Sequence, residues 1–175
     1  MADLELIRDF VNTADLEERR DELEDPRGLV RWLAAHRLAG EHARARAEDA
    51  ADARAVREAL RELLRGNNGV AVDEAAAAAT LDAASRRAGL SVRFTDGSMI
   101  RLVPREHGVS GALGGVLAAA AEAMADGTWQ RLKACRSDTC CWAFVDNARN
   151  RSRQWCSMSV CGNREKARVF RGRHA

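Results

Sequence analysis

Hydrophobic residues recur at helical spacing through the first half of the chain. Leu4, Ile7 and Val11 are three or four positions apart, which predicts a short amphipathic helix that ends before Asn12-Thr13. Asp25-Pro26 predicts the start of a second helix, because aspartate caps free backbone amides and proline already has a helical φ. The beginning of the chain is therefore predicted to be helical.

Further helices are predicted over residues 41–65, 73–87 and 110–124 from the same spacing. Between the last two the period changes to two. Residues 90–95 alternate apolar and polar side chains, Asp96-Gly97 favours a tight turn, and the alternation resumes after it. We therefore expect an α+β protein: residues 1–130 form a mainly helical domain with a β-hairpin, and residues 131–175 form a small second unit.

Composition and charge add two expectations. The absence of 18 to 20 uninterrupted apolar residues, and of a basic-then-apolar sequence after Met1, predicts a cytoplasmic protein with no membrane span. Residues 131–175 hold 11 Lys and Arg against 3 Asp and Glu, a net charge of +8, whereas residues 1–130 have a net charge of −6. A basic tail favours a polyanionic partner, although a solvated surface explains the charge equally well.

All five cysteines lie in the basic tail. Cys135 and Cys140 enclose four residues, Cys156 and Cys161 enclose another four, and fifteen residues separate the pairs. This spacing is typical of a structural zinc site in which two tight turns each present two thiolates. The zinc would replace the hydrophobic core that so short a segment cannot build, which predicts a treble-clef-like or knuckle finger with a C-terminal helix.

Other uses of the cysteines fit less well. An odd number of cysteines in a cytosolic chain disfavours disulfides, and a redox dithiol favours the closer C-x-x-C spacing. A catalytic zinc would keep one position open, whereas four thiolates fill the shell. Cys141 is left over: it could replace Cys140 as a ligand, act as a redox-sensitive thiol, or pack.

The segment Trp155-Cys156-Ser157-Met158, followed by Cys161-Gly162-Asn163-Arg164, resembles the CGNR zinc-finger family. Trp142–Asp146, Asn150, Ser152-Arg153 and Lys166 extend the resemblance over about residues 132–171. The resemblance implies that Cys140, rather than Cys141, is the ligand. Ala148 and Cys141 depart from the family pattern, and neither is among the four implied ligands.

The front of the chain resembles the ABATE domain, which accompanies this finger and whose name is associated with stress-induced transcription regulation. Asp9-Phe10-Val11-Asn12-Thr13 carries that resemblance. It implies a transcription regulator with DNA as its partner and, by analogy with other regulators, a first domain that senses a small molecule. Asn12 and Arg57 are the candidate residues of such an effector pocket, although the simpler interpretations are that Asn12 caps a helix or hydrogen-bonds to backbone and that Arg57 is solvated.

Ser157 is expected to cap a helix that begins near Met158, with Cys161 in its first turn. At 100° per residue, Arg164, Arg168 and Arg171 share one stripe of that helix. Arg164 could instead pair with Asp146. The full set of candidate nucleic-acid residues is Arg149, Arg151, Arg153, Arg164, Lys166, Arg168, Arg171 and Arg173.

The tryptophans and Phe144 of the tail are interpreted as the finger's own small core rather than as stacking platforms for bases. Two functions remain: a zinc-containing DNA-binding transcription regulator, or a zinc-stabilised module that docks on an acidic protein such as transcription machinery. An enzyme is not expected, because the chain has no Gly-rich phosphate loop, nucleophile elbow or histidine-carboxylate metal motif.

Overall fold

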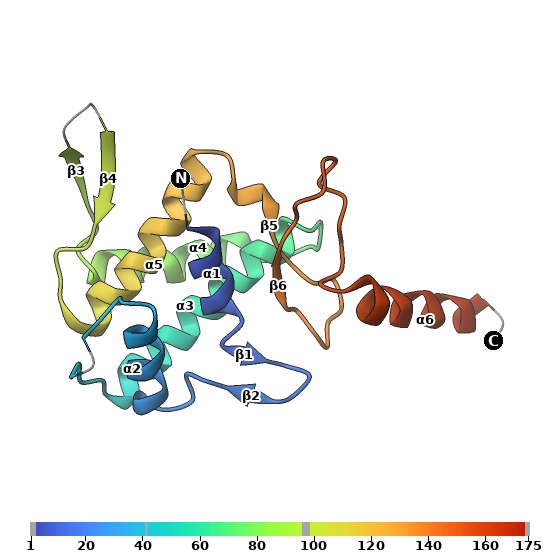
Figure 1. Cartoon of the computed structure of the whole chain (residues 1–175), viewed down its shortest axis with the longest axis horizontal. Helices are drawn as coiled ribbons and strands as arrows, with labels where there is room; N and C mark the ends of the chain where they lie inside the picture. Colours follow the sequence, from blue (N-terminus) through green and yellow to red (C-terminus); the bar gives the residue numbers. More distant parts are fainter. Residues whose placement is uncertain (1–2, 41, 96–98, 174–175) are drawn as a thin grey trace.

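The computed structural model describes residues 3–40, 42–95 and 99–173, which form a helical body, three two-stranded hairpins and a projecting C-terminal helix (Figure 1). The elements in chain order are α1 (Leu4–Val11), β1 (Ala14–Asp15), β2 (Arg20–Asp21), α2 (Pro26–Ala35), α3 (Ala47–Gly66), α4 (Glu74–Arg87), β3 (Ser91–Thr95), β4 (Met99–Val103), α5 (Gly108–Ala125), η1 (Trp129–Arg131), β5 (Leu132–Ala134), β6 (Ala143–Val145), η2 (Met158–Gly162) and α6 (Asn163–Arg173). The expected α+β class is confirmed.

The helix starts follow the capping residues that the sequence offers. The Asp25 side chain accepts a hydrogen bond of 2.7 Å from the amide of Gly28, and Pro26 is the first residue of α2. Asp73 caps α4 in the same way through the amide of Ala76. These helices therefore begin where sequence reasoning expected them.

Helix α3 begins at Ala47, several residues later than the predicted residue 41. Arg44 and Arg46 lie before this start, whereas Glu48 and Asp49 lie in the first turn. Acidic side chains are favoured at the positive end of a helix and basic ones are disfavoured. In addition, the Asp49 carboxylate accepts a hydrogen bond of 2.7 Å from the Arg46 amide, which stabilises the later start.

Helix α5 lies in the hydrophobic core, and eleven of its residues are buried. By length and composition alone this 18-residue helix is apolar enough to cross a membrane, a property that the sequence analysis did not expect. The core helix of a globular protein passes the same test, and most of this helix is buried within the fold. Its apolar character is accounted for by its contacts with α1, α4 and β4.

The predicted hairpin is present as β3 and β4, which pair in antiparallel register with Val92 opposite Leu102 and Phe94 opposite Ile100. The expected Asp96-Gly97 turn lies outside the described residues. A third hairpin, β5–β6, opens the C-terminal unit and pairs Lys133 with Phe144.

The β5–β6 hairpin also contributes to the main core. Leu132, Ala134 and Ala143 belong to the same cluster of buried residues as the side chains of α1, α3 and α5. The predicted division of the chain at residue 130 therefore falls within a shared core, and as a boundary between domains it stays a prediction.

Candidate metal centre and nucleic-acid interface

The four predicted zinc ligands lie together in space. The Sγ atoms of Cys135, Cys140, Cys156 and Cys161 are all within 4.8 Å of one another, and three of these residues are buried. Cys135 directly follows β5, and Cys140 ends the turn that leads back to β6. Cys161 lies in η2, a π-helical turn that continues into α6. Cys156 lies two residues before η2, so two hairpin positions and two positions at the entry to the last helix converge on one point.

The cluster has the dimensions of a zinc site. Sulfur atoms roughly 2.3 Å from a tetrahedral zinc ion lie roughly 3.8 Å apart. The Sγ atoms of Cys140 and Cys156 are 3.6 Å apart, and those of Cys156 and Cys161 are 3.7 Å apart. All five cysteines are free thiols. The donor set and its spacing therefore fit one zinc ion, held by four thiolates in a closed structural shell.

Hydrogen bonding within the cluster separates the pKa values of its thiols. Hydrogen bonding with Cys140 lowers the pKa of Cys135 to about 5 despite its burial, and backbone amides of Cys156 and Ser137 assist. Burial raises the pKa of Cys156 to about 12, and the shared proton raises that of Cys140. The raised pKa values favour the protonated forms of Cys140 and Cys156, so a divalent cation that takes both as thiolates displaces their protons.

Cys141 stands outside the cluster. Its side chain is buried and its Sγ lies 3.4 Å from the carbonyl oxygen of Ser137. Its φ of 49° is in the left-handed region, which is uncommon for residues other than glycine and turns the chain from Cys140 into β6. The structure thus places Cys140 in the metal cluster and Cys141 in a packed turn beside it.

The finger has a small core of its own. Trp142 and Trp155 are partly buried against the cysteines, and the Phe144 ring is buried under the guanidinium of Arg153, 4.6 Å from the ring centre. The glycine of the CGNR segment allows this packing, because a Cβ atom on Gly162 would lie 3.2 Å from the Trp155 ring. Phe144 is part of the core, whereas Trp142 and Trp155 are only partly buried, so their interpretation as core rather than as stacking platforms stays a prediction.

A buried ion pair that the sequence analysis missed supports the loop between the cysteine pairs. Lys133 Nζ lies 2.8 Å from the carboxylate of Asp146, whose side chain is fully buried. Burial alone would raise the pKa of Asp146, but hydrogen bonds from Lys133 and from the amides of Ala148 and Arg153 lower it overall. Because Asp146 pairs with Lys133, it is not the partner of Arg164 that the sequence suggested.

Asparagine side chains of the helical body form hydrogen bonds with backbone groups at the start of the finger. The Asn12 amide accepts a hydrogen bond of 2.7 Å from the Ala143 N–H and donates one of 3.0 Å to the Ala143 carbonyl. Asn67 donates to the carbonyls of Trp129 and Leu132, and Asn68 to those of Ala134 and Gln154. The finger is therefore fastened to α1 and to the end of α3.

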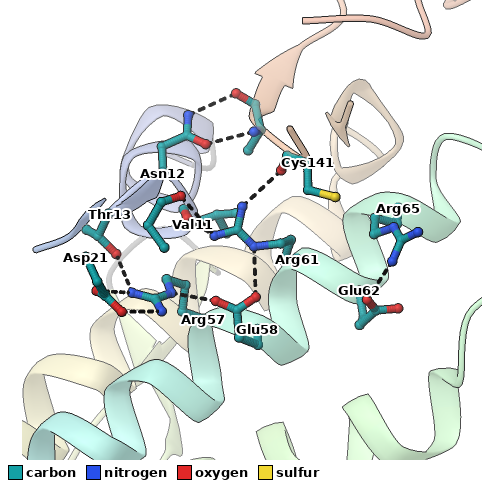
Figure 2. A network of polar contacts seen from close by, with 12 residues as sticks. Val11, Asn12, Thr13, Asp21, Arg57, Glu58, Arg61, Glu62, Arg65 and Cys141 are labelled. Carbon is teal, nitrogen blue, oxygen red and sulfur yellow. Dashed lines mark hydrogen bonds and ion pairs between the residues drawn. The ribbon is translucent and has the colours of Figure 1, made fainter. Parts of the chain in front are cut away.

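Two buried arginines of α3 complete this junction (Figure 2). Arg57 forms a bidentate pair with Asp21 at 2.6 and 2.8 Å and also donates to Glu58. Arg61 donates to the carbonyls of Val11 and Cys141, at 2.8 and 3.0 Å. The network thus joins β2, α3 and the turn that carries the metal cluster.

The proposed effector residues are used by this network. Arg57 is buried rather than solvated, and Asn12 bonds to β6. Asn12 also lines an open cleft of about 840 Å³ between α1, α2 and the finger, together with Trp32, His36 and Arg153, but Arg57 does not line it. The structure therefore does not bring Asn12 and Arg57 together as a pocket.

The predicted arginine stripe on α6 faces a groove. Arg164, Arg168 and Arg171 line a depression of about 810 Å³ whose other wall includes Arg136 and Trp155. Arg136 is held in place by hydrogen bonds to the carbonyls of Asn68 and Gly69. Sequence spacing could not identify Arg136, which comes from the turn after β5 rather than from the helix.

Several basic residues make contacts that the sequence did not predict. Arg164 forms an ion pair with Glu17 of the β1–β2 hairpin. Arg153 donates to the carbonyls of Trp155 and Cys156 and lies on the cleft rather than in the groove.

The expected N-cap of the last helix is absent: the Ser157 side chain does not cap the helix, because its Oγ bonds to that of Ser159.

The remaining candidate residues lie outside the groove. Arg149 and Arg151 are exposed in the loop between the cysteine pairs. Lys166 lies on a different side of α6, where it lines a second depression with Val169. Arg173 is the last residue of α6. Binding of nucleic acid by these residues stays a prediction.

Comparison with known proteins agrees with this geometry. Residues 4–127 match the ABATE family, described as "Putative stress-induced transcription regulator", and residues 131–174 match the CGNR zinc finger. No curated protein matches the chain. The clustered cysteines lie within the matched finger, as a zinc ligand set requires. The chain belongs to the ABATE family, and its C-terminal part is a CGNR zinc finger whose four clustered cysteines fit one zinc ion.

Proposed function

We propose that this protein binds duplex DNA through the groove between α6 and the turn after β5, and so acts as a zinc-dependent transcription regulator. The observation that carries the proposal is the convergence of Arg136, Arg164, Arg168 and Arg171 on one groove beside the metal cluster. Guanidinium groups suit phosphate oxygens, and contacts of this kind position a protein on nucleic acid.

The charges of the groove remain available to phosphates. Arg168 pairs with Glu165 on the same exposed helix face, a pair that solvent and salt weaken. Arg171 is exposed, and among the described residues no carboxylate pairs with it. Arg164 is shared with Glu17, so Arg136, Arg168 and Arg171 are the principal phosphate contacts.

Zinc has an indirect role in this proposal. Cys161 lies in the turn that leads into α6, and Cys135 precedes Arg136, so the metal fixes the two walls of the groove relative to each other. Without the metal, the arginines on the two walls would no longer be held at fixed positions relative to each other. A cytoplasmic location is part of the proposal, since five free thiols fit a reducing compartment.

Sensing of a small molecule by the first domain is a second part of the proposal. The open cleft between α1, α2 and the finger supports it, because a ligand there would touch both matched regions. Trp32 lines the cleft but is only 5% exposed, and His36 stacks on it at a ring-centroid distance of 4.0 Å, so a ligand would reach His36 and Asp9 rather than the tryptophan ring. A ligand in this cleft would lie next to the hydrogen bonds between Asn12 and Ala143 of β6.

The direct test is binding of the zinc-loaded full chain to a labelled duplex of mixed sequence at low salt. Replacing Arg168 and Arg171 with alanine should weaken binding at least about tenfold, and removing zinc should abolish it. The matched control replaces Arg93 and Arg101, which are equally charged but lie on β3 and β4. Absence of duplex binding by the wild-type chain would contradict the proposal.

The same variants separate the alternative function. If the finger docks only on an acidic protein, a polyglutamate probe should bind the wild-type chain and lose affinity in the Arg168/Arg171 variant, while the duplex binds neither. If the wild-type chain binds the duplex but not the polyglutamate probe, the result favours the DNA-binding function.

A further inference from the structure

The β3–β4 hairpin exposes an apolar face. Val92, Phe94 and Ile100 are 54%, 81% and 63% exposed, and with Leu102 they form two directly opposed cross-strand pairs on one side of the ribbon. The hairpin stands away from the helical body, at the opposite end of the molecule from α6 (Figure 1). A large apolar surface of this kind marks a site of interaction.

The other face of the ribbon is basic. Arg93 lies directly opposite Arg101, both are exposed, and among the described residues neither has a carboxylate partner. Like charges in opposed positions destabilise a strand pair. Residues 90–105 hold three arginines against one acidic residue, although residues 1–130 together carry a net charge of −6. The hairpin is thus a basic region on an acidic domain.

The ribbon also has unpaired edges. The sheet consists of β3 and β4 only, so each strand has an edge that pairs with no other described strand. A two-stranded hairpin is marginally stable by itself, and an added strand would satisfy backbone groups along such an edge. Side chains of an added strand alternate between the two faces.

We propose that this hairpin is a docking site for an extended segment of a protein partner in which acidic and apolar residues alternate. The apolar side chains would cover Phe94 and Ile100, and the carboxylates would pair with Arg93 and Arg101 on the other face. Because the hairpin and α6 lie at opposite ends of the molecule (Figure 1), such a partner leaves the groove that α6 lines accessible. The proposal does not depend on DNA binding.

Neither of the two other occupants satisfies both faces of the ribbon. A second copy paired edge to edge would place the arginines of both copies on one face of a continuous sheet, which is repulsive, and a second copy packed on the apolar face would leave the arginines without a partner. Nucleic acid would meet the arginines but leave the apolar face in water. An acidic and apolar strand matches both faces.

The test uses a labelled synthetic peptide in which glutamate and valine alternate, added to the zinc-loaded full chain. We expect binding that weakens at least tenfold in the Arg93→Glu/Arg101→Glu variant and also in Phe94→Ser/Ile100→Thr. The charge-reversed variant should instead bind a peptide of alternating lysine and valine. A glutamate–serine peptide, which lacks the apolar side chains, should bind weakly to every variant.

Zinc content and melting temperature show that the variants remain folded, since all four positions are exposed. Three results would overturn the proposal: peptide binding unaffected by both variants, a wild-type dimer in sedimentation that Phe94→Ser/Ile100→Thr dissociates, or duplex DNA binding that requires Arg93 and Arg101. The second result would assign the face to a second copy, and the third would assign it to nucleic acid.

Discussion

Replacing Asn12 with alanine tests whether the helical body holds the zinc finger in place. The side chain makes both of its hydrogen bonds to the backbone of Ala143, a residue that is only 1% exposed. The φ of Asn12 is −80°, so alanine introduces no backbone strain. Any loss of stability therefore reports on the two hydrogen bonds.

The size of the effect follows from what the substitution leaves behind. Each backbone group that loses its buried partner costs about 1–3 kcal/mol. The cleft beside Asn12 and Ala143 is open, so water can reach the exposed edge and reduce this cost. We expect the free energy of unfolding to fall by about 2–3 kcal/mol. If opening of the finger limits metal release, about 2 kcal/mol corresponds to roughly 30-fold faster release.

Two assays measure these quantities: urea unfolding at constant excess zinc, and the rate of zinc transfer to a coloured chelator. Asn147→Ala is the matched control, because Asn147 lines the same cleft and is exposed. The reasoning would be refuted if Asn12→Ala were no less stable than Asn147→Ala, or if it lost stability without faster zinc release. The second outcome would mean that the junction does not hold the metal cluster together.

Three further predictions concern the finger and its supports. Cys140→Ser should lose the bound zinc, whereas Cys141→Ser should retain one zinc per chain in native mass spectrometry. Equal loss of zinc in the two variants would contradict the assignment of Cys140, rather than Cys141, as the ligand. Lys133→Met should lower the free energy of unfolding in urea by about 3–5 kcal/mol because it leaves the Asp146 charge buried and unpaired, and a loss under about 1 kcal/mol would contradict the importance of that pair. Burial raises the pKa of Asp21, but the hydrogen bonds from Arg57 and the Leu23 amide, together with the positive charges of Arg57 and Arg54, lower it overall. Its stabilising effect is therefore present above pH 3.8 and is lost as pH falls through the lowered value, so the stability difference from Asp21→Asn in urea should be constant near neutral pH and shrink in acid.

Local features could be predicted well from the sequence because their causes are local. Asp25 and Asp73 cap helices through residues three positions away, and the Phe94 to Ile100 strand pair follows from alternation on both sides of a turn. The cysteine spacing predicted the metal cluster for the same reason. Each of these features depends on neighbours in the chain.

Features that join distant segments could not be predicted in this way. Arg57 is a charged residue on an alternating helix, and only the position of Asp21 in the fold makes it a buried partner. Arg136 enters the groove because the turn after β5 packs against Asn68. Glu17 forms an ion pair with Arg164, which is more than a hundred residues away in the sequence. Periodicity and spacing contain no information about such contacts.

The central claim is that a zinc-organised groove binds phosphates, and the salt dependence of duplex affinity tests it most directly. For the zinc-loaded full chain, the slope of log affinity against log salt should become shallower by about 0.9 for each arginine–phosphate contact removed. Arg168→Ala/Arg171→Ala should therefore flatten the slope by about 1.8, while Arg93→Ala/Arg101→Ala leaves it unchanged. An unchanged slope in the first variant, or an equal change in both, would contradict the account.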